Sequence, residues 1–361
     1  MLTSILAVIL LLPCSTSPAE SGSSFSAKTD SSPLWISLKA ENPNGKHIVF
    51  ITGDEEYRSE EGMPQLARIL SHYHGFQCTV LFSIDSESGC IDPGILDNIP
   101  GLEQLKDADL MVLFTRFRNL PDPQMKFIVD YVESGKPIIG LRTSTHAFLI
   151  PEDRKYHRWS FRNPEWEDGF GRQIMGETWI DHHGGHGWQS TSGLLVEDMK
   201  NHPIVRGISD GDVWDPSDVY TVRLPLPKDC QPILMGRVLS GMDPKDGPCE
   251  AEERDGEIYD KNDPMMPLAW IRELKLSAEK SQRVFSTTMG ASQAFSQEGS
   301  RRLLVQACYW CLGMEKKIDG KGKVDIVGEF KPTPFGFDRH RKGLKPADLL
   351  VESVPIPAKK P

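Results

Sequence analysis

The fold of this chain is limited above all by short apolar runs that alternate with helical patterns. Four runs have the composition of buried strands, namely residues 47–52, 77–82, 109–115 and 137–141. Between them, residues 63–73 and 123–133 carry apolar side chains at helical spacing. Alternation of this kind predicts βαβ units with right-handed crossovers. We therefore expect an α/β fold with a doubly wound, mostly parallel sheet.

The regular alternation stops beyond residue 150. Residues 151–192 are rich in Trp, Arg, Gly and His, which indicates a long functional excursion after the central strand. Residues 241–263 are acidic and rich in Gly and Pro, and they predict an exposed loop. The expected organisation is, in order, a signal peptide (1–19), a flexible leader (20–45), one α/β domain (46–315) and an extended C-terminal tail (316–361).

The N-terminus has the pattern of a secretory signal peptide. Residues 5–12 are apolar, and Ser17-Pro18-Ala19 fits a signal-peptidase cleavage site. Cys14 allows a lipoprotein alternative, but Pro13 directly before it fits that signal poorly. We expect export to the periplasm or the extracellular space, and no other stretch is long and apolar enough to span a membrane.

Charge and cysteine content narrow the possible partners and chemistry. A formal net charge of -10 argues against a nucleic-acid partner, which would need a basic surface. Without the leader an even number of cysteines remains, which permits disulfides in an exported protein but does not require them. Cys308 and Cys311 form a CxxC within the pattern of a buried helix, so a core role is favoured over a redox pair. The sequence does not determine the oligomeric state.

Polar clusters follow three of the predicted strands. They are Asp54, Glu55, Tyr57 and Arg58, then Arg116 and Arg118, then Arg142, Thr143, Ser144 and His146. In a parallel sheet these strand ends meet at one edge, where open α/β sheets bind ligands. The alternative is that some of these residues are helix caps or solvated loop residues, above all Asp54 and Ser144.

A second group of polar residues lies in the segment DHHGGHGW, residues 181–188. His182, His183 and His186 are candidates to bind a divalent metal or to transfer protons. The alternative is local hydrogen bonding, since the spacing matches no closed zinc pattern. The tryptophans of the same excursion, Trp188 among them, would suit the C–H face of a sugar, although they equally fit a small satellite core.

The turn after residue 141 does not carry an obvious nucleophile. The sequence RTSTH lacks the glycine frame of a nucleophile elbow. Ser144 and His146 are too close in sequence to be assumed a Ser–His pair, and Ser144 is only a minor candidate. No cysteine lies at this turn, so thiol chemistry of the amidotransferase kind is excluded.

Several short segments together resemble the ThuA-like (trehalose utilisation) family, a branch of the class I glutamine amidotransferase-like fold, which is flavodoxin-like. The matching segments span residues 46–315 and are HIVFITG, GKPIIGLRTSTHAF, IMGETWIDHHGGH, NHPIVRGI, DPSDVYTV, MPLAWIRE, RVFSTTMGAS and YWCLG. The resemblance implies a carbohydrate-related ligand and roles for His202 and the Asp218/Tyr220 segment. The chain departs from both groups at Arg142, which stands where amidotransferases have Cys and ThuA-like proteins usually have His.

Our first functional hypothesis is an exported enzyme of the hydrolase or isomerase type that acts on a carbohydrate or sugar derivative. His182, His183 or His146 would be the general acid or base, with Glu55 as a second such group. Arg142 and Arg116 would hold an anionic or keto oxygen. The other residues expected to contact substrate are Asp54, Tyr57, Arg58, Ser144 and Trp188.

Two alternatives stay open at this stage. A non-catalytic sugar-binding or scaffold protein would keep the binding edge of the fold without its chemistry, and the substitution by Arg142 favours it. A metal-dependent hydrolase would use His182, His183 and His186 as ligands. No cofactor is certain, and a divalent metal is the one candidate.

Overall fold

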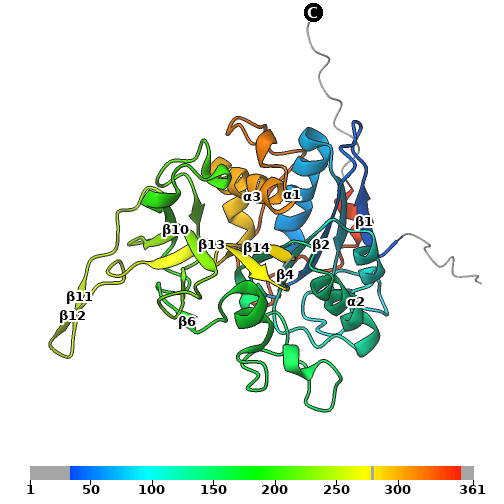
Figure 1. Cartoon of the computed structure of the whole chain (residues 1–361), viewed down its shortest axis with the longest axis horizontal. Coiled ribbons are helices and arrows are strands. Elements are labelled where there is room, and N and C mark those ends of the chain that lie inside the picture. Colours follow the sequence, from blue (N-terminus) through cyan, green and yellow to red (C-terminus); the bar gives the residue numbers. More distant parts are fainter. Residues whose placement is uncertain (1–32, 278–279, 351–361) are drawn as a thin grey trace, which may run out of the picture. The chain divides into compact units, whose positions relative to one another are not determined.

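The centre of the fold is a ten-stranded mixed sheet (Figure 1). The computed structural model describes residues 33–277 and 280–350, so the predicted signal peptide lies outside the described residues. The strand order is β1-β3-β2-β4-β5-β14-β13-β10-β7-β8.

Five neighbouring strands form the parallel part of this sheet. In spatial order they are β3 (Gln77–Leu81), β2 (His47–Gly53), β4 (Leu110–Thr115), β5 (Ile138–Leu141) and β14 (Ser281–Thr287). Strands β2, β4 and β5 are buried along their whole length, which explains their almost continuous apolar sequences. The predicted α/β fold class is confirmed.

Antiparallel strands extend the sheet on both sides. Strand β1 (Trp35–Leu38) adds to the β3 edge, so part of the predicted leader is strand. Beyond β14 follow β13 (Met266–Lys275), β10 (Cys230–Val238), β7 (Thr191–Leu195) and β8 (Trp214–Asp215). A separate two-stranded sheet pairs β6 (Asp181–His182) with β9 (Tyr220–Thr221).

The segment 241–263 contains a hairpin, which the sequence prediction of an irregular loop missed. Strand β11 (Glu252–Arg254) pairs with β12 (Glu257–Tyr259). Asp255 and Gly256 between them have φ of 53° and 84°. An Asp-Gly pair with positive φ at both positions is the two-residue turn that antiparallel hairpins favour, so the signal was present in the sequence.

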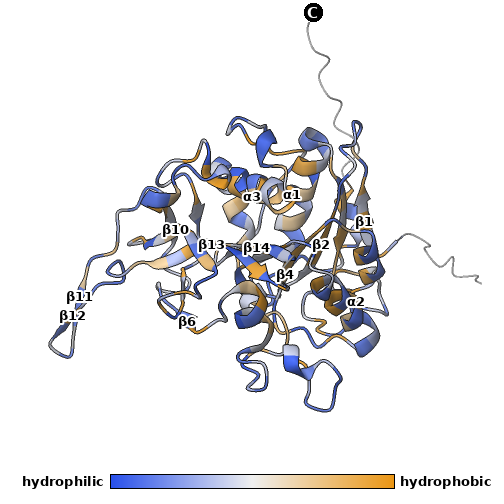
Figure 2. Cartoon of the chain, viewed as in Figure 1, coloured by the Kyte–Doolittle hydropathy of each residue, from blue (hydrophilic) through white to orange (hydrophobic). Residues whose placement is uncertain are grey.

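Within residues 33–277 and 280–350, three α-helices cover the two faces of the sheet. Helices α1 (Ser59–His74) and α3 (Glu298–Cys311) share one hydrophobic core with the sheet, whereas α2 (Asp122–Glu133) packs into the core on the other face. Met125, Ile128, Val129 and Val132 are buried, as the helical spacing predicted. Cys308 and Cys311 are buried free thiols within α3. Figure 2 shows apolar residues concentrated in the central strands and on the helix sides that face them.

The carboxyl ends of the parallel strands form the sheet edge at which a ligand site is expected. Strand β2 lies between β3 and β4, so consecutive units of the chain cross to opposite sides of β2. The carboxyl ends of β2 and β4 are adjacent, with Gly53 opposite Thr115. Open α/β sheets bind ligands outside the carboxyl ends of their strands at such a switch point. The site is therefore expected beside residues 53–58, 115–118 and 141–146.

The chain after α3 returns to this edge. Residues 319–345 contain no helix or strand, but Thr333, Phe335 and Gly336 contact the segment that follows β2. Over residues 33–277 and 280–350, no helix has the length and apolar character needed to cross a membrane.

Candidate functional site

The turn after β2 is built around the buried carboxylate of Asp54. Asp54 accepts backbone hydrogen bonds from Glu56, at 2.8 Å, and from Tyr57. Thr143 donates its hydroxyl to the other carboxylate oxygen at 2.5 Å, which joins this turn to the one after β5. Burial, with a smaller contribution from the charge of Glu55, raises the pKa of Asp54. Asp54 thus holds the two turns together rather than facing a ligand.

Arg142 begins the turn after β5 and is completely buried. Its φ is 41°, a left-handed conformation that costs on the order of 1–3 kcal/mol and persists only where the surroundings enforce it. Its Nη1 donates to the carbonyl oxygens of Asp218 and Thr288, both at 2.7 Å. The guanidinium lies between two aromatic rings, 4.1 Å from the centroid of Tyr57 and 4.2 Å from that of Tyr220.

The side chain of Arg142 is directed at Asp218. Its Nη2 is 3.2 Å from Asp218 Oδ1 and 2.9 Å from the hydroxyl of Tyr57. Both charged side chains of this pair are fully buried. Arg142 and Tyr57, which were predicted to contact substrate, therefore form the buried support of a carboxylate. Arg142 is thus an anchor for Asp218.

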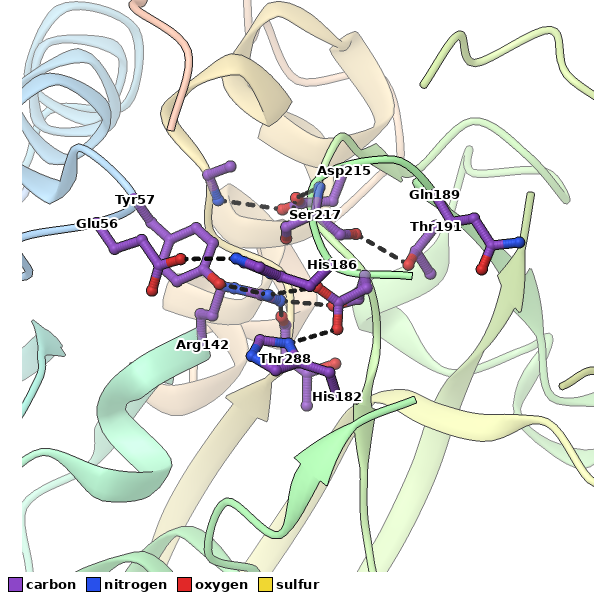
Figure 3. Close-up of polar contacts among 12 residues, drawn as sticks. Glu56, Tyr57, Arg142, His182, His186, Gln189, Thr191, Asp215, Ser217 and Thr288 are labelled. Atoms are coloured by element: carbon purple, nitrogen blue, oxygen red, sulfur yellow. Dashed lines mark hydrogen bonds and ion pairs between the residues drawn. The ribbon is translucent and has the colours of Figure 1, made fainter. Parts of the chain in front are cut away.

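Asp218 holds two histidines at this edge of the sheet. Figure 3 shows the two, His182 and His186, beside Arg142. His182 Nδ1 lies 2.7 Å from Asp218 Oδ2, and His186 Nδ1 lies 3.1 Å from Oδ1. The Nε2 of His186 is 3.0 Å from Glu56 Oε1. The two imidazole centroids are 4.3 Å apart. The side chains of Asp218 and Glu56 are buried, whereas those of His182 and His186 are 30% and 37% exposed.

Electrostatics fixes the charges within this group. Burial alone would raise the pKa of Asp218, but hydrogen bonds from His182 and His186 and the charge of Arg142 outweigh it and hold the pKa far below the usual range. The pKa of Glu56 is lowered for the same reason, since the bond from His186 overcomes burial. Hydrogen bonds to Asp218 and then to Glu56 raise the pKa of His186 to about 9. At neutral pH both carboxylates are ionised and His186 is a cation.

Glu55, proposed as a second acid/base group, is occupied by two arginines. It pairs with Arg116 and, at 2.8 Å, with Arg118. Arg118 is fully buried and also donates to Ser83 Oγ and to the carbonyl oxygens of Pro93 and Ile95. Arg116 keeps 21% of its side chain exposed. Glu55 keeps 19% exposed, so both partners of this ion pair are partly accessible and Arg118 is not.

An aromatic wall adjoins the two histidines. His146 is buried, 5.0 Å from the ring of Phe117 and 5.4 Å from that of Trp179. Trp179 in turn lies 5.8 Å from His182. Burial, helped by the nearby charge of Arg116, lowers the pKa of His146 well below 6.5. His146 is therefore neutral and packed among rings, which suits a wall of the site better than a proton donor.

The remaining predicted residues lie apart from this group. His183 turns the other way, and its Nε2 is 2.6 Å from the carbonyl oxygen of Lys261. Ser144 is buried and donates to the carbonyl of Leu113 at 2.7 Å. Arg58 is buried and donates to the carbonyls of Glu55 and Glu56. Trp188 is 54% exposed, and its ring lies over the Lys261 ammonium at 4.9 Å.

One set of atoms has the geometry to hold a metal ion. One ligand atom from each of His182, His186 and Asp218 lies within 4.8 Å of the others. Two imidazoles and a carboxylate are a donor set used by zinc and other divalent ions. His183, the third histidine of the predicted set, does not reach this point because it faces Lys261.

Two central residues were missing from the candidates chosen on residue pattern. Glu56 was passed over for its neighbour Glu55, and only the register of the turn after β2 decides which carboxylate reaches His186. Asp218 entered only through the family resemblance, because it lies 76 residues from Arg142 in the chain. His202, also suggested by the resemblance, accepts from the backbone N–H of Ile204 and packs on Trp310, and it makes no contact with the histidine pair.

One family model matches most of the chain. The model of the ThuA family, described as trehalose utilisation, matches residues 48–311. A search of curated proteins found no match. Among solved structures, a ThuA-like protein from Bacteroides uniformis is 17% identical, with a TM-score of 0.46 over 75% of this chain and 93% of its own. One from Parabacteroides merdae is 16% identical, with a TM-score of 0.44 over 82% of this chain and 98% of its own.

Proposed function

The chain belongs to the ThuA (trehalose utilisation) family, and on that premise we propose that it binds and converts a carbohydrate or a sugar derivative beside His182 and His186. The family description supports the ligand class. The partly exposed ring of Trp179 near His182 also supports it, because the C–H face of a sugar packs on aromatic rings while its hydroxyls need polar partners.

The observation that carries a catalytic role is the hydrogen bond between His182 and Asp218. An ionised carboxylate only accepts hydrogen bonds, so the Nδ1 of His182 must carry the proton. In this tautomer the Nε2 of His182 has a lone pair. In the described part of the chain, no hydrogen bond to this Nε2 is present. A partly exposed imidazole oriented by a buried carboxylate is the arrangement of a general base.

His186 complements this base as a fixed positive charge. Asp218 and Glu56 together keep it protonated at neutral pH. A cation held beside a base stabilises negative charge that develops on a sugar oxygen when His182 removes a proton. The proposed chemistry is therefore proton transfer at a hydroxyl, or at a carbon next to a keto group, in a reaction of the hydrolase or isomerase type. It does not use the cysteine of the amidotransferases.

Turnover by matched histidine variants tests this proposal. Wild-type protein would be incubated with a panel of sugars and keto-sugars, and products would be detected by mass spectrometry. We expect product with the wild type and a loss of about 100-fold or more in His182→Ala, the usual range for removing a general base. His183→Ala is the control, because His183 is adjacent to His182 in sequence but faces Lys261. Equal losses in both variants would contradict the assignment of His182.

The same experiment separates the non-catalytic alternative. If the wild type binds a sugar in calorimetry but forms no product from any member of the panel, the result would indicate a non-catalytic sugar-binding protein. The buried position of Arg142 is compatible with that outcome, since it holds the site without taking part in a reaction.

A metal-dependent hydrolase is a second candidate, favoured by the close approach of His182, His186 and Asp218. A bound divalent ion would supply a Lewis acid and lower the pKa of a bound water. Elemental analysis of the purified protein, followed by calorimetric titration with Zn²⁺, tests this candidate. Stoichiometric binding that is lost in His186→Ala and kept in His183→Ala would support it, and no binding to the wild type would refute it.

We also propose that the protein is exported, on the signal-peptide pattern of residues 1–19. Cell fractionation with N-terminal sequencing of the mature chain tests this. A mature protein that begins near Glu20 outside the cytoplasm is the expected result, and an uncleaved cytoplasmic chain would contradict it.

A further inference from the structure

A segment outside the family match reaches the histidine group. The ThuA match ends at residue 311. Beyond it, Phe335 and Gly336 lie against the turn after β2. Thr333 contacts Glu61 of α1, and Phe337 contacts Arg116 after β4. The backbone N–H of Gly336 donates to the carbonyl of Glu56 at 2.7 Å, and Arg58 donates to the carbonyl of Gly336. The segment is thereby joined directly to the residue that holds His186.

A buried carboxylate fixes this segment from the other side. Glu61 accepts from the backbone N–H of Thr333 at 2.7 Å and from its hydroxyl at 2.9 Å. Arg341, further along, lies 3.3 Å from the same carboxylate. The position of residues 333–341 is therefore set by specific polar contacts, and not only by apolar packing.

Two phenylalanines of this segment take different positions. Phe335 stacks on Tyr57 at 5.3 Å between centroids, and it lies 5.8 Å from the ring of His186. The ring of Phe337 lies 5.0 Å from the guanidinium of Arg116 and stays 50% exposed. Phe335 is thus part of the support of His186, whereas Phe337 presents an uncovered aromatic surface beside a partly exposed cation.

A continuous series of ring contacts runs from Phe335 past the two histidines to Arg116 and Phe337. From Phe335 they run to His186, His182, Trp179, His146 and Phe117 at centroid distances of 5.8, 4.3, 5.8, 5.4 and 5.0 Å. Arg116 then joins Phe117, at 4.6 Å, to Phe337, at 5.0 Å. Without residues 335–337 this series would lack its contacts with His186 and Arg116 at the two ends. The C-terminal segment therefore connects the histidine pair to Arg116, and Phe337 is the exposed aromatic residue of this connection.

We propose that Phe337 and Arg116 form a second saccharide subsite beside the histidine pair, so that the C-terminal segment makes the protein select disaccharides over monosaccharides. This inference rests on the proposed carbohydrate function. The C–H face of a second sugar unit would stack on the Phe337 ring, and Arg116 would donate to its hydroxyl oxygens. Of the two residues, Phe337 lies outside the family match, whereas Arg116 lies within it.

Calorimetric binding of sugars of two sizes tests the subsite. The probes are the disaccharides trehalose, maltose and cellobiose, and the monosaccharide glucose. In Phe337→Ala we expect binding of the preferred disaccharide to weaken by about five- to tenfold, the range for the loss of one aromatic stacking contact. Glucose binding should stay within about twofold, since the histidine pair is unchanged. Ile326→Ala, which removes an exposed apolar side chain that lies between α3 and this segment, is the control.

A second variant displaces the segment without changing Phe337 or Arg116. Glu61→Ala removes the acceptor of Thr333 and should reproduce the selective loss of disaccharide affinity. Wild-type affinity for both sugar sizes in Phe337→Ala would overturn the subsite and leave the proposed function intact. Failure of the wild type to bind any of the four sugars would overturn both. An equal loss for glucose and disaccharide would also contradict a separate subsite.

Discussion

Replacing Asp218 by Asn should destabilise the protein by about 3 kcal/mol, because it leaves a buried arginine without its carboxylate. The Asp218 carboxylate is 3.2 Å from Arg142 and accepts hydrogen bonds from His182 and His186. Asn keeps the shape of the side chain and removes the charge. Breaking a buried ion pair by removing one partner costs roughly 3–5 kcal/mol. The carbonyl oxygens that Arg142 keeps, at 2.7 Å, place the expected cost at the lower end.

Urea denaturation measures this cost, with the m-value checking that unfolding remains a single transition. Glu56→Gln is the matched control, since it removes a carboxylate that touches His186 and not Arg142. We expect the control to cost about 1 kcal/mol or less, because the side chain of His186 is 37% exposed and its ion pair is screened. A cost for Asp218→Asn no larger than that of the control would refute the role given to the buried pair.

Two further predictions concern the same edge of the sheet. The charge of His186 contributes stability that is fully present below its unfolded pKa of 6.5 and is lost as pH rises through about 9. After discounting for its exposure, we expect a decline of about 1–2 kcal/mol over this range relative to His186→Gln, and parallel pH profiles for the two proteins would argue against it. Arg118→Lys should cost about 2–3 kcal/mol in urea denaturation, because a single ammonium cannot reach Glu55, Ser83 and two carbonyls at once. A cost below about 0.5 kcal/mol would contradict it.

Local patterns were sufficient to predict the parallel part of the fold. Buried strands must be apolar on both faces, so residues 47–52 and 109–115 stand out within the sequence. The helical spacing of residues 123–133 likewise follows from one buried face. Strand β1 escaped prediction because its four residues lie at the sheet edge in a polar segment and are stabilised by pairing with β3. Long-range pairing of this kind leaves no periodic signal.

The site was predicted less completely, because it depends on which way individual side chains turn. The sequence predicted that the candidate polar residues follow strands whose ends meet at one sheet edge, but it assigned ligand contacts to Arg142 and Tyr57, which are buried. Adjacent residues such as His182 and His183 share one pattern, and only the β6–β9 pairing directs them to opposite partners. Phe335 and Phe337 contact Tyr57 and Arg116 because the chain returns to this sheet edge after α3, and no local sequence pattern indicates that return.

The pKa of His186 tests most directly whether Asp218 and Glu56 act together on the histidine pair. NMR titration of the imidazole resonances, assigned with His186→Gln, would give this value in the wild type. A midpoint at about 9 that falls toward 6.5 in Glu56→Gln is the result predicted by the two hydrogen bonds. A wild-type midpoint near 6.5, unchanged in Glu56→Gln, would contradict the charged pair of carboxylates around His186 and the role assigned to it.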